Sequence, residues 1–408
     1  MKFNTSLLHT VKPTKEDHGA TQTPIYQVSA FAYDSAEQLE KVFNNKAAGF
    51  SYSRVGNPTV DAFEKRIASL EGGIGAVACS SGMSAITSLF LSILQSGDEV
   101  IAGAGLFGGT LDLLYDLNAF GITVRFVDTV TADSVRDNIT PQTKAVFTEL
   151  IGNPKLNIAD LEKVSEVCRE NRVPLIADST TATPYLIQPL KHGADVVIHS
   201  SSKYMNGGGN SISGVIVDGG SFNWDKERYP VFREYAKFGK FALIFRLRND
   251  VWRNMGSCLS PFNAYMNLTG LDTLGIRMER SCDNALKLAQ FLETVDGIEV
   301  NYPALPSSPY YDIAQKYFGG KGGAILTVRV GSKERAFRLI NALKYALIAT
   351  NIGDVKTLVI HPASTIYTHS TEEQKISAGV YEDTIRISVG IEDIDDLTED
   401  FRQAAESL

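Results

Sequence analysis

From Val196 to Gly209 the chain reads VVIHSSSKYMNGGG, and this stretch decides the fold. An apolar, β-branched run followed by small hydroxyl residues and glycines predicts a buried strand that opens into the floor of a pocket. Lys203 lies in that floor, where partial burial lowers the pKa of its amine and makes it a nucleophile. The obvious use is a Schiff base with a carbonyl cofactor. An isolated lysine would more often be a solvated side chain at a strand end, so its neighbours must decide.

Asp178 ends a second apolar run, Leu175-Ile176-Ala177. Open α/β sheets bind ligands at the carboxyl ends of their strands. A carboxylate there suits pyridoxal phosphate, whose ring nitrogen must stay protonated if the ring is to accept electrons. The alternative is an N-cap for the next helix, and by itself Asp178 does not separate the two.

A third signal is Ser80-Ser81-Gly82-Met83, which joins the short strand around Val77 to the helical stretch from Ala85 to Leu94. The free N–H groups of Gly82 and Met83 at a helix start predict a phosphate site. The hydroxyls of Ser200 and Ser202 could add donors from the lysine loop. This turn is common by itself, and it is informative because it precedes Asp178 and Lys203 in one α/β array.

Strand and helix patterns alternate over residues 56–250, which predicts an α/β domain with a mostly parallel sheet covered by helices. We expect strands at Val77, Val100-Ile101, Val124 to Phe126, Ala145 to Phe147, Leu175 to Ala177, Val196 to Ile198 and Val215 to Val217. We interpret residues 1–55 as an arm that reaches a neighbouring subunit. Residues 251–408 predict a smaller α+β domain, with a long helical pattern from Pro261 to about Leu292. The aromatic and charged stretch 221–253 has no clean period, and we expect a surface or substrate-side segment there.

Composition excludes several classes of protein. The 408 residues are 44% hydrophobic and 21% charged, as in ordinary soluble proteins. A net charge of −8 gives no electrostatic case for binding nucleic acid or an anionic membrane. The sequence shows no apolar run of membrane-spanning length and no signal-peptide core. Its four scattered cysteines and six histidines lack metal-ligand spacing, so we expect no metal and a cytoplasmic location.

Motifs along nearly the whole chain resemble the Cys/Met-metabolism family of fold-type I pyridoxal-phosphate enzymes. They are Tyr52-Ser53-Arg54, Asn57-Pro58-Thr59, Ser81-Gly82-Met83, Phe107-Gly108-Gly109-Thr110, Glu149 with Asn153-Pro154, Asp178, Ser200 to Tyr204, Ser260-Pro261-Phe262, Gly270 to Leu274, His361 to Ser364, and Arg386 to Gly390.

The resemblance implies a role for each matching residue. Lys203 would bind the cofactor covalently and shuttle protons on the substrate, and Asp178 would pair with the ring nitrogen. The phosphate would be held by Gly82, Met83, Ser200 and Ser202, and by Tyr52 and Arg54 of a neighbouring subunit. Phe107 would stack on the cofactor ring, where most members have tyrosine. The substrate would contact Arg386, which suits its α-carboxylate, together with Asn351 and Asn153.

Family members differ in what they attach or expel at the substrate Cγ. Methionine γ-lyases carry a cysteine where this chain has Gly109, and the segments Ala349 to Leu358 and Gly379 to Asp393 resemble the sulfhydrylase form. We therefore favour O-acetylhomoserine sulfhydrylase activity: an O-acyl homoserine plus sulfide or a small thiol, in a homo-oligomer that we expect to be a tetramer built from two dimers. A methionine γ-lyase, a cystathionine γ-synthase or lyase, and a cofactor-binding homologue with little turnover stay open, as do the acyl group and the sulfur donor.

Overall fold

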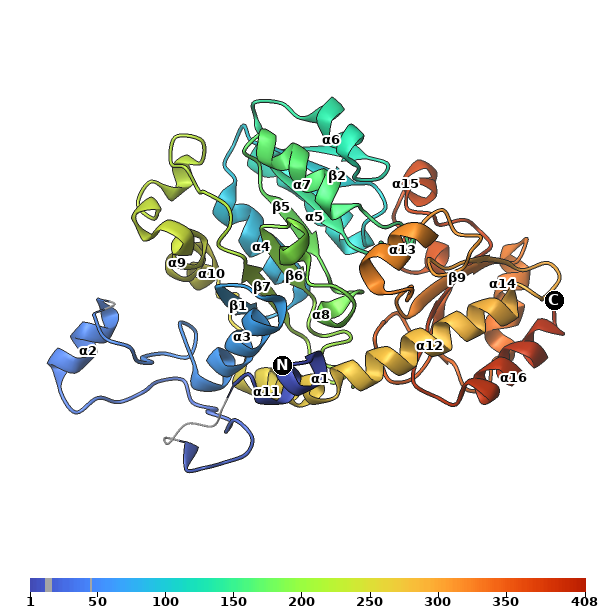
Figure 1. Ribbon diagram of the computed structural model, residues 1–408, viewed down its shortest axis with the longest axis horizontal. Coiled ribbons are helices and arrows are strands. Elements are labelled where there is room, and N and C mark those ends of the chain that lie inside the picture. Colours follow the sequence, from blue (N-terminus) through green and yellow to red (C-terminus); the bar gives the residue numbers. More distant parts are fainter. Residues whose placement is uncertain (12–16, 45) are drawn as a thin grey trace.

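Two sheets organise the computed structural model, which describes residues 1–11, 17–44 and 46–408 (Figure 1). The larger sheet has the order β1-β7-β6-β5-β4-β2-β3. Its strands are β1 (Gly75–Cys79), β2 (Glu99–Gly103), β3 (Thr123–Val127), β4 (Thr143–Glu149), β5 (Leu175–Asp178), β6 (Val196–His199) and β7 (Gly214–Asp218). All seven predicted strands are present.

The larger sheet is mostly parallel, as predicted. Strands β3, β2, β4, β5 and β6 run parallel, whereas β7 pairs antiparallel with both β6 and β1. The central strands are buried along their whole length, which explains their continuous apolar runs. Glu149 pairs in register with Asp178 at the carboxyl ends of β4 and β5, so two acidic residues lie side by side where these two strands end.

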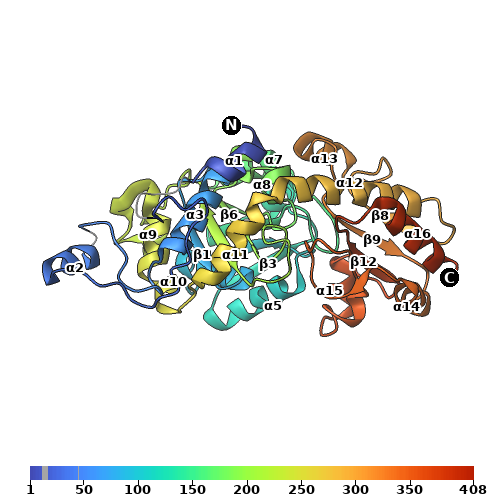
Figure 2. The same ribbon diagram turned by 90° about the horizontal axis from the view of Figure 1, so that it is seen from below.

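Helices cover this sheet. The helices before residue 260 are α1 (Phe3–His9), α2 (Ala36–Phe43), α3 (Pro58–Glu71), α4 (Gly82–Ile93), α5 (Gly108–Asp116), α6 (Ala132–Asn138), α7 (Leu161–Glu170), α8 (Thr183–Leu186), α9 (Ala242–Asn249) and α10 (Val251–Asn254). Helix α3 begins at Pro58 behind the N-cap Asn57 and ends at Gly72 in the left-handed conformation. In both views α2 stands away from the body of the molecule, at the end opposite the C-terminal part (Figures 1 and 2).

A five-stranded sheet of order β10-β11-β12-β9-β8 forms the C-terminal part. Its strands are β8 (Glu299–Asn301), β9 (Ile325–Arg329), β10 (Leu347–Ile348), β11 (Leu358–Ile360) and β12 (Thr384–Ser388). The helices from residue 261 onward are α11 (Pro261–Asp272), α12 (Leu274–Leu292), α13 (Tyr311–Phe318), α14 (Lys333–Ala342), α15 (Glu372–Ser377) and α16 (Ile394–Ala405). The long pattern beyond Pro261 is thus two helices, and α12 extends from the larger sheet to the C-terminal part (Figure 2).

The segment 221–253 lies largely at the surface, as expected, because most of its side chains are exposed or half-buried. It also has a buried side that was not expected: Trp224, Tyr229, Phe232 and Trp252 are buried and belong to the same apolar cluster as α4. Short 3-10 helices and a kink at Gly239 interrupt the segment, so no single period marks its buried side.

Candidate active site

A pocket of about 380 Å³ opens at the carboxyl ends of β4, β5 and β6 and at the start of α4. It brings together residues from positions 81 to 386. It is lined by Ser81, Gly82, Met83, Ile86, Phe107, Thr110, Glu149, Asn153, Asp178, Thr180, Thr181, Ser200, Ser202, Lys203, Ile212, Thr350, Asn351, Ile352, Ile366 and Arg386. Every residue that we expected in the site lies there except Tyr52 and Arg54.

Lys203 lies in the loop after β6 with its Nζ 2.6 Å from Asn351 Oδ1. Burial, with a contribution from the nearby Arg386 guanidinium, lowers the pKa of the Lys203 amine to about 8. A much larger fraction of this amine is therefore uncharged and nucleophilic near neutral pH than for an exposed lysine.

Hydroxyl groups hold the lysine loop in place. Ser202 Oγ accepts a hydrogen bond from the Ser213 N–H at 2.8 Å and donates to the Ser213 carbonyl at 3.0 Å. The Ser200 N–H donates to Thr180 Oγ1 at 2.8 Å, which connects the loop to the end of β5. The Ser202 hydroxyl thus helps to hold the loop, and both Ser200 and Ser202 line the pocket, Ser200 beside Gly82.

Asp178 and Glu149 form a buried pair of carboxyl groups on adjacent strands. Burial raises the pKa of Asp178, although hydrogen bonds from Thr180, including its N–H at 2.9 Å, act in the opposite direction. Burial and then the neighbouring Asp178 raise the pKa of Glu149, while the N–H groups of Phe107 and Asn153 act in the opposite direction. A cationic ring nitrogen at Asp178 would relieve the repulsion between the two groups.

The N-terminus of α4 presents free backbone N–H groups that could bind an anion. Ser81 caps the helix by accepting the Ser84 N–H at 3.0 Å, which leaves the Gly82 and Met83 N–H groups without helical partners. A Cβ at Gly82 would lie 2.7 Å from Ser200 Cβ, so only glycine allows this close approach to the lysine loop. These features fit a phosphate group bound at the helix N-terminus.

Arg386, on β12, is buried, and burial lowers its pKa to about 10. Its Nη1 donates to Asn153 Oδ1 at 3.2 Å, and its Nη2 donates to the carbonyls of Thr350 and Asn351 at 3.1 and 3.0 Å. Its Nε has no protein partner among the described residues. The guanidinium is thus held by neutral acceptors and keeps its charge available for a carboxylate.

Phe107 immediately precedes α5 and is 36% exposed at the pocket wall. Its N–H donates to Glu149 Oε1 at 2.8 Å. A Cβ at Gly109 would lie 2.9 Å from Phe107 Cε1, so the ring occupies space that any larger residue at 109 would claim. An exposed aromatic face in a pocket suits stacking on a planar ring.

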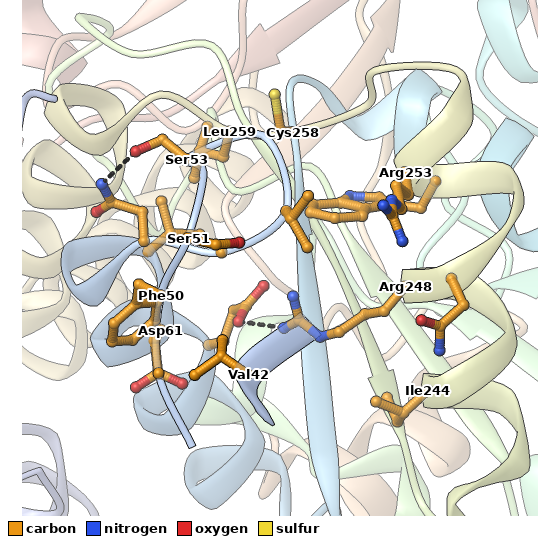
Figure 3. A pocket seen from close by; sticks show the side chains of 18 of the residues that line it. Val42, Phe50, Ser51, Ser53, Asp61, Ile244, Arg248, Arg253, Cys258 and Leu259 are labelled. Carbon is orange, nitrogen blue, oxygen red and sulfur yellow. Dashed lines mark hydrogen bonds and ion pairs between the residues drawn. The ribbon is translucent and has the colours of Figure 1, made fainter. Parts of the chain in front are cut away.

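Tyr52 and Arg54 lie outside this pocket. Arg54 Nη1 donates to the Arg253 carbonyl at 3.0 Å, and Tyr52 is 43% exposed. The residues between and beside them line a separate cavity of about 330 Å³, which Ser51 and Ser53 share with Arg248 of α9 and Arg253 of α10 (Figure 3). Within a single chain, the two predicted phosphate ligands and Lys203 are therefore not brought together.

Sequence reasoning assigned no role to several residues that line the pocket. Thr180 hydrogen-bonds both Asp178 and Ser200, and Glu149 accepts backbone N–H groups from Phe107 and Asn153. Glu149 ends β4, and Thr180 lies two residues after the end of β5. Both positions could have been recognised from the sequence, because ligand sites gather at the carboxyl ends of such strands.

Among residues 1–11, 17–44 and 46–408, no cluster of three or more metal-ligating side chains occurs. Over the same residues, no helix combines the length and apolar character that a membrane span needs.

The fold and this pocket define a pyridoxal-phosphate enzyme of fold type I. The chain belongs to the Cys/Met metabolism PLP-dependent enzyme family, whose model matches residues 4–406. It is 42% identical to O-acetyl-L-homoserine sulfhydrylase of Corynebacterium glutamicum, over 98% of this chain and 95% of that one. It is 39% identical to L-methionine gamma-lyase of Treponema denticola, over 97% and 94%.

A solved structure supports the cofactor. The putative O-acetylhomoserine (thiol)-lyase of Campylobacter jejuni superposes with a TM-score of 0.93 and 35% identity over 100% of both chains, and it carries pyridoxyl-lysine monophosphate. The anion site at Gly82, the lysine of lowered pKa and the buried carboxyl pair fit this group.

Proposed function

We propose that this chain catalyses γ-replacement on O-acetyl-L-homoserine, with sulfide or a small thiol as the incoming group, giving homocysteine or methionine and acetate. The observation that carries the proposal is the convergence of Lys203, Asp178 and Arg386 on one pocket. The relatives named O-acetyl-L-homoserine sulfhydrylase, at about 40% identity over nearly the full chain, supply the substrate class.

Pyridoxal phosphate, when bound, supplies an electron-accepting ring that stabilises negative charge at the substrate Cα. Asp178 is the residue that we assign to the ring nitrogen, and Gly82, Met83, Ser200 and Ser202 are those that we assign to the phosphate. In the same assignment, Lys203 removes the proton at Cα and moves protons at Cβ once its amine is free. A pKa of about 8 suits this role, because such an amine can both accept and return a proton near neutral pH.

In the proposed arrangement Arg386 holds the substrate α-carboxylate, and Asn153 fixes the guanidinium through Oδ1. This clamp orients Cα toward Lys203, and Asn351 holds the Lys203 amine on the side of the substrate loop. Expulsion of acetate from Cγ then needs no strong acid, because acetate is a good leaving group.

Gly109 favours replacement over γ-elimination. The space that a side chain at position 109 would need is filled by the Phe107 ring, since a Cβ there would lie 2.9 Å from Phe107 Cε1. A pocket of the γ-lyase type, with cysteine at this position, would require the ring to move.

The test is an assay of purified, cofactor-loaded protein with O-acetyl-, O-succinyl- and O-phospho-homoserine, each with and without sulfide. We expect homocysteine with the acetyl substrate and sulfide, and little 2-oxobutanoate without sulfide. Lys203→Ala is the control that should abolish both products. Equal 2-oxobutanoate release with and without sulfide would instead identify a lyase, and no product from any substrate would leave a cofactor-binding homologue.

We further propose that the chain works in the cytoplasm as a homo-oligomer, at least a dimer and most simply a dimer of dimers, in which Tyr52 and Arg54 complete a neighbour's site. The support is their position in a separate, exposed region of the arm. Mixing inactive Arg54→Ala chains with inactive Lys203→Ala chains should restore partial activity, since some hybrid sites combine intact halves. Hybrids that form without regaining activity would rule out a shared site.

A further inference from the structure

We propose that Glu149 is a positioning residue that ties the cofactor-stacking Phe107 to the Arg386 carboxylate clamp. The substrate part of this proposal rests on the proposed function, whereas its cofactor part needs only that the protein binds pyridoxal phosphate.

The two oxygens of Glu149 hold two different parts of the pocket. Oε1 accepts the Phe107 N–H at 2.8 Å, and Oε2 accepts the Asn153 N–H at 3.1 Å. Only a carboxylate can accept both N–H groups with equivalent oxygens, because an amide would turn one NH₂ group toward a donor. The side chain thus spans the gap between the wall behind the cofactor and the substrate side.

Each of these contacts leads to a group with a predicted role. The Phe107 carbonyl accepts from the Thr110 and Leu111 N–H groups, so with its N–H held by Glu149 the Phe107 backbone is anchored on both sides at the start of α5. Asn153 accepts from Arg386 Nη1 at 3.2 Å, so a displaced Asn153 backbone would shift the guanidinium.

A contribution to folding stability does not explain why position 149 is acidic. Glu149 is buried opposite Asp178, and two buried carboxyl groups on adjacent strands repel each other when both are charged. No hydrogen bond from a lysine or arginine to Glu149 occurs in the part of the chain that the structure describes. An acidic residue here instead serves to hold both N–H groups beside a cationic cofactor ring.

The experiment compares Glu149→Ala and Glu149→Gln with a matched control, Asp400→Ala. Asp400 is also a buried carboxylate that accepts backbone N–H groups, from Lys344 at 2.8 Å and Tyr345 at 2.9 Å, and it lies on α16 outside the pocket. The readouts are the visible circular dichroism of bound cofactor, its Kd, thermal unfolding, and KM and kcat separately for O-acetyl-L-homoserine.

We expect Glu149→Ala to lose most of the cofactor dichroism and to raise the cofactor Kd about tenfold, the effect of one hydrogen bond to a charged group. Its KM should rise about tenfold with a smaller change in kcat. Glu149→Gln, which keeps one acceptor, should fall between wild type and Glu149→Ala. Asp400→Ala should lower the unfolding temperature and leave dichroism, Kd and KM unchanged.

A double variant sharpens the test. Asn153→Ala removes the acceptor for Arg386, so combined with Glu149→Ala it should raise KM by less than the product of the two single effects. The proposal is overturned if Glu149→Ala only lowers the unfolding temperature, or if Asp400→Ala alters dichroism and KM equally. Wild-type protein without activity on O-acyl homoserines would refute the proposed function, while dichroism and Kd would still decide the role of Glu149.

Discussion

Replacing Arg386 with lysine keeps the positive charge of the clamp and removes its planar fork. Arg386 uses separate N–H donors on Asn153 Oδ1, Thr350 O and Asn351 O, at 3.2, 3.1 and 3.0 Å. A single ammonium group cannot occupy these positions and also bind a carboxylate through two oxygens. Losing two charge-assisted hydrogen bonds at about 1.5 kcal/mol each costs about 3 kcal/mol, or about 100-fold in kcat/KM.

The assay measures kcat/KM for O-acetyl-L-homoserine and for its α-carboxamide analogue, with sulfide in both cases and cofactor occupancy checked by absorbance. Wild type should prefer the carboxylate strongly, and Arg386→Lys should lose most of that preference by becoming slower on the carboxylate alone. A lysine variant that keeps the wild-type preference would refute the assignment of Arg386 to the α-carboxylate.

Arg66 provides a matched control. It is also a buried arginine whose Nε lacks a protein partner among the described residues, and its Nη1 donates to Leu268 O and Asp272 Oδ1 at 3.1 and 2.9 Å. These contacts join α3 to α11, away from the residues that line the pocket. Arg66→Lys should lower the unfolding temperature and leave the preference for the carboxylate intact.

Three further predictions concern the cofactor side of the pocket. Because the amine of Lys203 has a pKa of about 8 and reacts only when uncharged, the rate of cofactor uptake by cofactor-free protein should rise about tenfold per pH unit below pH 8 and level off above it; a rate still rising steeply at pH 10 would show an ordinary lysine. Phe107→Tyr adds a hydroxyl that could serve as a general base, so kcat/KM at neutral pH should rise by up to about 100-fold and should depend less on pH. Stopped-flow measurements across pH would show both changes, and a slower variant would mean that the pocket is adapted to phenylalanine. Gly82→Ala would place a Cβ 2.7 Å from Ser200 Cβ and should weaken cofactor binding in a fluorescence titration, whereas Gly75→Ala meets only Ile244, with Cγ1 at 3.5 Å, and should bind normally.

The elements of the larger sheet could be predicted because their signals are local. Runs such as Val196-Val197-Ile198 are β-branched and buried on both faces, so the apolar run and the strand coincide. Lys203 and Asp178 were found for the same reason, since each directly follows or ends such a strand. The buried side of the segment 221–253 was missed because its short helices change direction too often to leave one period.

The contacts between distant segments could not be predicted from any local pattern. Lys203 meets Asn351 across 148 positions, and Arg386 meets Asn153 across 233. Both pairs exist because β12 and the loop before β11 bring the C-terminal part against the carboxyl ends of the larger sheet. The motif around Glu149 was visible in the sequence, yet its link between Phe107 and Asn153 was not.

By itself, the sequence determined the strands, the lysine and aspartate at their ends, and, through its motifs, the family. Each of these features depends on residues that lie close together in the chain, because the pattern of apolar side chains within one strand or helix shows which of its residues will be buried. The tertiary structure alone decided that Arg386 is held by Asn153, that Glu149 has two N–H partners, and that Tyr52 and Arg54 lie apart from Lys203. These depend on strand order and on how the loops pack, because a hydrogen bond is made only when distant segments fold to within about 3 Å of each other.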